Sequence, residues 1–118
     1  MDVVPPRGAG QGTLMTFPPD PRKLPSAKDV VAKFKAANYD PEGYTLYTYA
    51  AFQVWSQAVK KAGTTDAKKV MDTIKAGKWE TVIGPIEYDA KGDIKQIDYV
   101  VYKWDAKGGY TEVNPKGS

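Results

Sequence analysis

The sequence contains no cysteine and no histidine among its 118 residues. Without cysteine the chain cannot form disulfides or use thiolate chemistry. Cysteine usage therefore does not distinguish an oxidising from a reducing compartment. Without histidine it lacks the most common general base, metal ligand and pH-sensitive side chain. The GAGQG stretch at residues 8–12 is not followed by a predicted helix, so it is no phosphate-binding loop. We therefore expect neither enzyme activity nor a cofactor.

The excess of one charge sign is also small, with 17 basic and 14 acidic residues and a net charge of +3. So small an excess favours a solvated basic surface over a nucleic-acid or acidic-membrane partner. Tyr99 to Trp104 interleaves aromatic and basic residues, but with a single lysine and Asp98 beside it, which favours aromatic cross-strand pairs over base stacking. We expect no nucleic-acid partner.

Long hydrophobic runs are missing as well. The most apolar helical candidate contains Gln53 and Gln57, which makes it too polar for a membrane span. The first ten residues, MDVVPPRGAG, lack the basic-then-apolar pattern of a signal peptide. The expectation is a chain that is not embedded in a membrane and carries no signal peptide.

Aromatic residues are plentiful, with three Trp and eight Tyr, and one Trp and three Tyr lie in DPEGYTLYTYAAFQVWSQAVKKAG, Asp40 to Gly63. Asp40 is predicted to cap a helix here, with Pro41 at its first position and Gly63 closing it in the left-handed conformation. The apolar arc is wider than one stripe, which predicts a core helix covered on more than one side. It comprises Tyr44, Tyr47, Ala51, Trp55, Ala58 and Ala62, widened by Leu46, Ala50, Phe52 and Val54.

Around this helix the sequence predicts one strand and two further helices. Residues 1–12 are expected to form an irregular lead-in, and Thr13 to Phe17 a strand buried on both faces. The proline-rich PPDPRKLP predicts an extended loop without helix. The other helices are predicted from Ala27 to Ala37 and from Asp66 to Ala76. Their expected caps are Ser26 and Thr65, and their expected inward residues are Val30, Val31 and Phe34 in the first and Val70, Met71 and Ile74 in the second.

From Trp79 the pattern favours strands. Trp79 to Ile83 is predicted as one strand, broken by Gly84-Pro85. Three further segments, 86–88, 94–104 and 110–113, are predicted to form an antiparallel meander. They are joined by two turns of identical sequence, DAKG, at 89–92 and 105–108. Glu87, Asp89 and Asp93 do not have the spacing of a calcium loop, so a hairpin turn is favoured there. Residues 114–118 are predicted to be a tail.

The predicted fold class is mixed α/β: one buried strand, three helices, then the three-segment antiparallel meander. Such an inventory leaves Thr13 to Phe17 without a parallel neighbour, although a buried parallel strand needs partners on each side. The sequence therefore predicts missing strands, supplied by a longer chain or by a second copy. A strand edge left open tends to pair with a copy of itself. We expect a homo-oligomer that completes the sheet by self-association.

Four stretches together resemble a known family: TLMTFPPDPRKLP, the helix segment from Asp40 to Gly63, TVIGPIEYDAKGDI and YVVYKWDAKGGYTEV. They are similar to the C-terminal part of the periplasmic leucine/isoleucine/valine-binding proteins, the type I solute-binding subunits of branched-chain amino acid ABC importers. The resemblance covers roughly Gly12 to Val113. It implies a fragment of a periplasmic, two-lobed parent that closes on a small amino acid and delivers it to an ABC permease.

The resemblance also implies one ligand contact. Aligned on the YAA triplet, the aromatic residue that lines the family's pocket corresponds to Tyr44. From the residues alone, a tyrosine at a helix start is more often a packing residue with a solvated hydroxyl. The family's groups for the ligand's α-amino and α-carboxylate ends lie mostly in its earlier two-thirds, which have no counterpart here.

Two hypotheses follow. In the first, residues 13–113 are a fragment of a substrate-binding protein for branched-chain or related amino acids, flanked by a lead-in and a tail, and do not bind ligand alone. In the alternative, the chain is a stand-alone module that self-associates and binds no small molecule.

Overall fold

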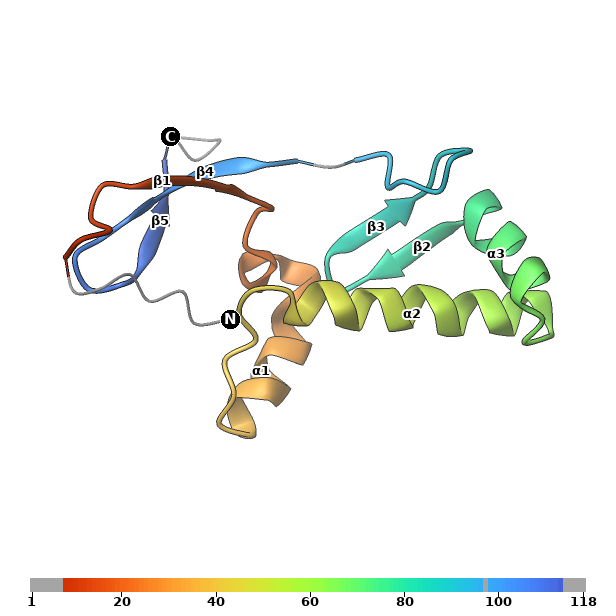
Figure 1. Cartoon of the computed structure of the whole chain (residues 1–118). Coiled ribbons are helices and arrows are strands. Elements are labelled where there is room, and N and C mark those ends of the chain that lie inside the picture. Colours follow the sequence, from red (N-terminus) through yellow and green to blue (C-terminus); the bar gives the residue numbers. More distant parts are fainter. Residues whose placement is uncertain (1–7, 97, 114–118) are drawn as a thin grey trace. The chain divides into compact units, whose positions relative to one another are not determined.

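A computed structural model of the chain describes residues 8–96 and 98–113. These residues form two compact units (Figure 1). One comprises residues 20–96 and contains the helices with a β-hairpin, whereas the other combines residues 8–19 with residues 98–113 and contains a separate sheet. The predicted tail at 114–118 and most of the predicted lead-in lie outside the described residues. The described part of the lead-in, residues 8–12, forms hydrogen-bonded turns.

The long helix, α2, spans Thr45–Ala62. Its end matches the prediction, since Gly63 adopts φ 67° and Lys60 and Lys61 lie in the last turn. Its start does not. The helix begins after Tyr44 and no side chain caps it, so the predicted cap at Asp40 is wrong. The carboxylate of Asp40 instead accepts a hydrogen bond from Arg22.

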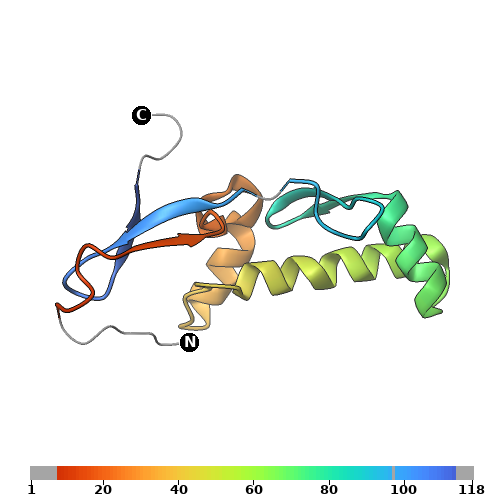
Figure 2. The same cartoon turned by 45° about the horizontal axis from the view of Figure 1, so that its top comes forward.

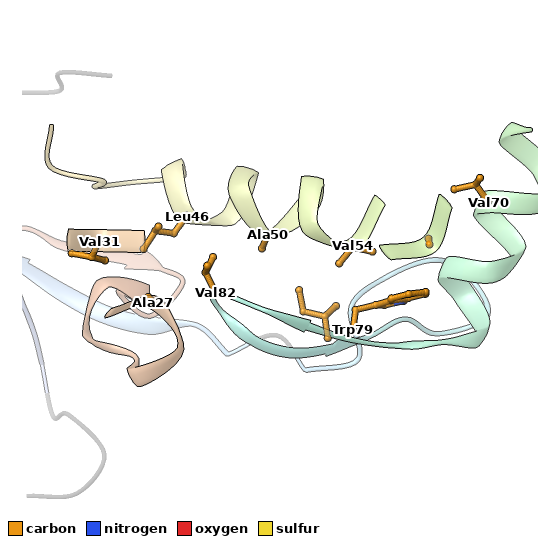
Figure 3. Packing of buried hydrophobic residues seen from close by; sticks show 10 residues of the cluster. Ala27, Val31, Leu46, Ala50, Val54, Val70, Trp79 and Val82 are labelled. Atoms are coloured by element: carbon orange, nitrogen blue, oxygen red, sulfur yellow. The ribbon is translucent and has the colours of Figure 1, made fainter. Parts of the chain in front are cut away.

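The core of this unit lies along one stripe of α2. Its buried residues are Leu46, Ala50, Val54 and Ala58, which recur every fourth position. Figure 3 shows Leu46, Ala50 and Val54 on the side of α2 that faces Val82 and Trp79 of the hairpin. The opposite face carries Phe52, which is 69% exposed, and Trp55, which is 51% exposed. The prediction that the helix is covered on more than one side is therefore wrong for the part of the chain that the structure describes.

Two glutamines of α2 bind the hairpin. The Gln53 side-chain oxygen accepts the Val82 amide at 2.8 Å, and the Gln57 amide nitrogen donates to the Glu80 carbonyl at 2.9 Å. These contacts satisfy hairpin backbone groups that face the helix. Gln53 and Gln57, which make the helix too polar for a membrane span, therefore attach it to the hairpin.

The hairpin consists of β2 (Lys78–Thr81) and β3 (Gly84–Glu87), which run antiparallel beside α2 in Figures 1 and 2. The predicted break at Gly84-Pro85 is wrong, because both residues belong to β3. The chain turns at Val82 and Ile83 instead. There the Thr81 hydroxyl donates to the Gly84 carbonyl at 2.7 Å and accepts the Ile83 amide at 3.2 Å. A proline is tolerated because both strands of a two-stranded sheet are edges.

The first short helix, α1 (Lys28–Ala36), begins without a capping side chain, so the predicted cap at Ser26 is wrong. The Ser26 hydroxyl donates to the Val82 carbonyl at 2.9 Å instead. Val31 is buried as predicted, with Val30 and Phe34 packed partly buried against the core.

The third helix, α3 (Ala67–Ala76), is capped by Asp66 rather than by the predicted Thr65, because the Asp66 carboxylate accepts the Lys69 amide at 3.0 Å. Val70 faces inward as predicted, but Met71 is 47% exposed, so its predicted burial is wrong. Its side chain follows Val70 by only one position, which turns it away from the stripe that contacts α2.

The proline-rich segment contains two single 3-10 turns, η1 (Pro21–Lys23) and η2 (Pro25–Ala27), where the sequence predicted an extended loop. Each turn begins with a proline. Proline suits the first position of such a turn because its φ is already set and no amide is needed there. The carboxylate of Asp20 accepts the Arg22 amide at 3.0 Å and so caps the first turn.

The other unit contains β1 (Leu14–Phe17), β4 (Val100–Trp104) and β5 (Tyr110–Glu112) in the order β1-β4-β5, with both pairings antiparallel. The prediction that the first strand is buried on both faces is wrong, because alternate residues are exposed and Leu14 is 60% exposed. An antiparallel neighbour from the same chain takes the place of the predicted missing parallel partner. Mixed α/β composition is confirmed.

Aromatic cross-strand packing holds this sheet, as predicted. The rings of Tyr102 and Trp104 each lie 5.2 Å from that of Tyr110 in edge-on geometry. The three-segment meander is confirmed only in its second half, where β4 and β5 pair antiparallel across the second DAKG turn. The first predicted segment belongs largely to the hairpin, and the ladder across the first DAKG turn is reduced to the bridge Tyr88↔Ile94, because β4 begins only at Val100.

Both DAKG segments do form turns, with the same chemistry. The Asp89 carboxylate accepts the amides of Gly92 and Asp93, and the Asp105 carboxylate accepts those of Lys107 and Gly109. The backbone amides hold the pKa of Asp89 below its usual value, Asp93 contributing most. Each carboxylate thus closes its own turn, as the hairpin interpretation predicted.

Candidate functional site

Tyr44, the predicted ligand contact, occupies the residue immediately before α2 and is 60% exposed. Its ring lies 6.3 Å from that of Tyr47, at an interplanar angle of 69°. A half-open pair of aromatic rings at a helix start can offer an apolar edge to a small aliphatic side chain. The structure thus gives Tyr44 an accessible position.

The segment leading to Tyr44 is held by a cluster of charges that the sequence predictions missed. The Nε and Nη2 groups of Arg22 donate to the Asp20 carboxylate at 2.8–3.1 Å, and Nη1 donates to Asp40 at 2.7 Å. Arg22 and Asp20 are partly buried, whereas Asp40 is more than half exposed. Two Asp-Pro pairs, with Pro21 and Pro41 buried, mark this arrangement in the sequence.

Asp20 and Arg22 each stabilise the charged form of the other. Burial raises the pKa of Asp20, but hydrogen bonds and charge from Arg22 lower it, and the net pKa lies below the usual value. The hydrogen bonds that Arg22 donates to Asp20 raise the pKa of Arg22 above its ordinary value. Burial lowers this pKa, and the contact with Asp40 raises it further. The guanidinium therefore stays charged, and its fork geometry joins both carboxylates at once.

A separate hollow of about 560 Å³ lies between α2, α3 and the turn after β3. Trp55 and Tyr88 contribute aromatic rings, Val70 and Ile74 line it from α3, and burial raises the pKa of Tyr88. Tyr44 does not line this hollow. At about 1.5 Å per residue, Trp55 lies about 16 Å further along the helix.

Residues 8–96 and 98–113 contain no group of three or more acidic, histidine or cysteine side chains that could hold a metal. Within the same residues, no helix combines the length and apolar character that crossing a membrane requires.

The sequence model of the family described as "Periplasmic binding protein" matches residues 2–109. The chain therefore belongs to the periplasmic binding protein family. It is 48% identical over 103 residues, 87% of its length, to an "Amino acid binding protein" of Pseudomonas aeruginosa. It is also 47% identical over 108 residues, 89% of its length, to "Leu/Ile/Val-binding protein homolog 1" of Brucella suis.

Solved structures support the same fold. A leucine-binding protein of Thermotoga maritima aligns with 88% of the chain at a TM-score of 0.71 and 24% identity, over 30% of its own length. A substrate-binding protein of Desulfitobacterium hafniense, solved with Leu, aligns with 88% of the chain at a TM-score of 0.70 and 24% identity, over 32% of its own length. These matches confirm the predicted type I binding-protein resemblance.

The chain is short beside these proteins. It spans 28% of the Pseudomonas relative and 29% of the Brucella relative. It thus corresponds to one section of a larger fold, which agrees with the predicted fragment of such a protein.

Proposed function

We propose that this chain is a section of an ABC-importer substrate-binding protein for branched-chain or related amino acids. The observation that carries the proposal is the 47–48% identity, over 87–89% of the chain, to relatives named for binding amino acids. The role is binding and delivery, without catalysis, for a periplasmic parent and its ABC permease. Within that parent, Tyr44 contacts the ligand's side chain.

The chemistry at Tyr44 suits this role. A leucine, isoleucine or valine side chain needs an apolar surface without unmet hydrogen bonds, which an aromatic ring edge supplies. Tyr47 supports the ring from the first turn of α2. The neighbouring charges of Arg22 and Asp20 already bind each other, so they leave the charged ends of an amino acid to other residues.

Because other residues must bind the charged ends of the amino acid, the chain alone does not bind ligand. An amino acid in a closed site needs partners for its ammonium and carboxylate groups, because burying either charge unpaired is costly. The exposed aromatic face of α2, with Phe52 and Trp55, also fits a helix from a larger fold, where further chain would cover it.

The alternative is a self-associating module without small-molecule binding. The same exposed face favours it, because apolar surface of this kind also pairs with a second copy. Size exclusion coupled to light scattering, with and without leucine and isoleucine, separates the two. A dimer with an unchanged melting temperature in either amino acid favours self-association, and a monomer with an unchanged melting temperature favours a section that needs the rest of its parent to bind. A monomer stabilised by leucine would mean that the chain binds ligand alone, which contradicts both hypotheses.

A chimera tests the main proposal directly. The 108 matching residues of the Brucella suis relative are replaced by those of this chain, and leucine binding is measured by calorimetry. We expect binding in the chimera and a loss of about tenfold or more for Tyr44→Ala, the equivalent of about 1.4 kcal/mol per tenfold. Tyr99→Ala, which removes another exposed tyrosine, is the matched control. A folded chimera without leucine affinity, or equal effects of the two substitutions, would refute the proposal.

A further inference from the structure

Arg22 joins two parts of the chain that are separated by 18 positions. One edge of its guanidinium binds Asp20 within the same turn, through Nε and Nη2 at 2.8–3.1 Å. The remaining nitrogen, Nη1, donates to Asp40 at 2.7 Å. Because Asp20 fixes the plane of the guanidinium, the third contact has a fixed direction. Asp40 is thereby held at a set place beside the turn Pro21–Lys23.

Each end of this contact lies next to a buried proline. Pro21 separates Asp20 from Arg22, and Pro41 follows Asp40. Pro41 is among the largest fully buried side chains of the described residues. The ion pair between Arg22 and Asp40 therefore has a buried proline beside each partner, and these prolines limit the movement of the chain at both ends of the contact.

From Asp40 the constraint reaches Tyr44 through the backbone. The Glu42 amide donates to the Asp40 carbonyl at 2.8 Å, and the Thr45 amide donates to the Glu42 carbonyl at 3.3 Å. Tyr44 precedes the helix with no side-chain cap. A helix start without a cap is prone to fraying, so its position depends on what holds the preceding residues.

We propose that Arg22 is a positioning residue for Tyr44: by binding Asp40, it fixes residues 40–43 and so the place of the Tyr44 ring. The consequence for ligand affinity rests on the proposed function, in which Tyr44 contacts the amino acid's side chain. The effect on the helix start does not rest on it. The two parts can therefore be tested separately.

The helix start is tested in this chain by hydrogen exchange. Arg22→Gln is expected to speed exchange severalfold at the amides of residues 45–48, while those of residues 58–62 stay unchanged. Lys23→Gln, which removes the same charge from the neighbouring exposed residue, is expected to change neither. No change at residues 45–48, or equal acceleration along all of α2, would overturn the positioning role.

The consequence for binding is tested in the chimera by a double-mutant cycle. Arg22→Gln is expected to weaken leucine binding about threefold to tenfold, and to have no further effect when Tyr44 is already alanine. Full additivity of the two substitutions would show that Arg22 does not act through Tyr44. If Tyr44→Ala alone leaves affinity unchanged, the ligand role of Tyr44 is refuted, and the exchange result alone decides whether Arg22 fixes the helix start.

Discussion

Leu46 is the residue whose truncation tests the core most directly. It is fully buried in α2, and Figure 3 shows it between Val31 and Val82. A Leu→Ala change at such a site costs about 2–5 kcal/mol, more when the surroundings cannot collapse. The valines here are β-branched and held by α1 and by the hairpin turn, so they cannot fill the space. We expect a loss in the upper half of that range.

This loss is large for the unit concerned. At roughly 0.05–0.15 kcal/mol per residue, a unit of this size is stable by about 4–12 kcal/mol. Urea unfolding followed by circular dichroism at 222 nm reports on α1, α2 and α3. Leu46→Ala is expected to lower the unfolding midpoint sharply, whereas Leu24→Ala, an exposed leucine of the same unit, should change it little. Equal shifts for both leucines would refute the assignment of the core.

Three further predictions concern single contacts. Gly77→Ala should lower the melting temperature, because an added Cβ would lie 2.5 Å from Trp79 Cζ2 on a buried ring, and the overpacking costs about 1–3 kcal/mol. Asp66→Ala should lower the stability measured by urea unfolding by about 1 kcal/mol through loss of the α3 cap, with no matching effect from Thr65→Ala. The pKa of Asp20 is lowered by folding, so its contribution is present at neutral pH and is lost as the pH falls below about 4. Urea unfolding at stepped pH should therefore show a shallower acid loss of stability in Asp20→Asn than in the wild type, and equal slopes would contradict the pairing.

Sequence patterns predicted the helices well because each is a local event. Gly63 closes α2 through its own left-handed conformation, and Val31 and Val70 face inward because helical spacing already groups them with their neighbours. The two DAKG turns were likewise predictable, since an aspartate that binds the amides following it needs no distant partner. The family resemblance was also carried by contiguous motifs.

Contacts between distant segments decided the rest. Ser26 and Asp40 have the chemistry of helix caps, but neither caps a helix. The Ser26 hydroxyl binds the Val82 carbonyl, and the Asp40 carboxylate binds Arg22. The first strand looked like a buried parallel strand, yet its neighbour is β4, more than 80 residues later, and one face stays exposed. No local pattern encodes which of two satisfactory partners a polar group meets.

The sequence by itself determined the fold class, the helices and the family, because helical periodicity, glycine ends and contiguous motifs are properties of neighbouring residues. Only the tertiary structure decided which stripe of α2 is buried and how its start is held. Both sides of that helix are apolar enough to pack, so burial follows from where the β2–β3 hairpin lies. The hold on Tyr44 likewise depends on Arg22 reaching Asp40, a contact that exists only once the chain between them has folded back.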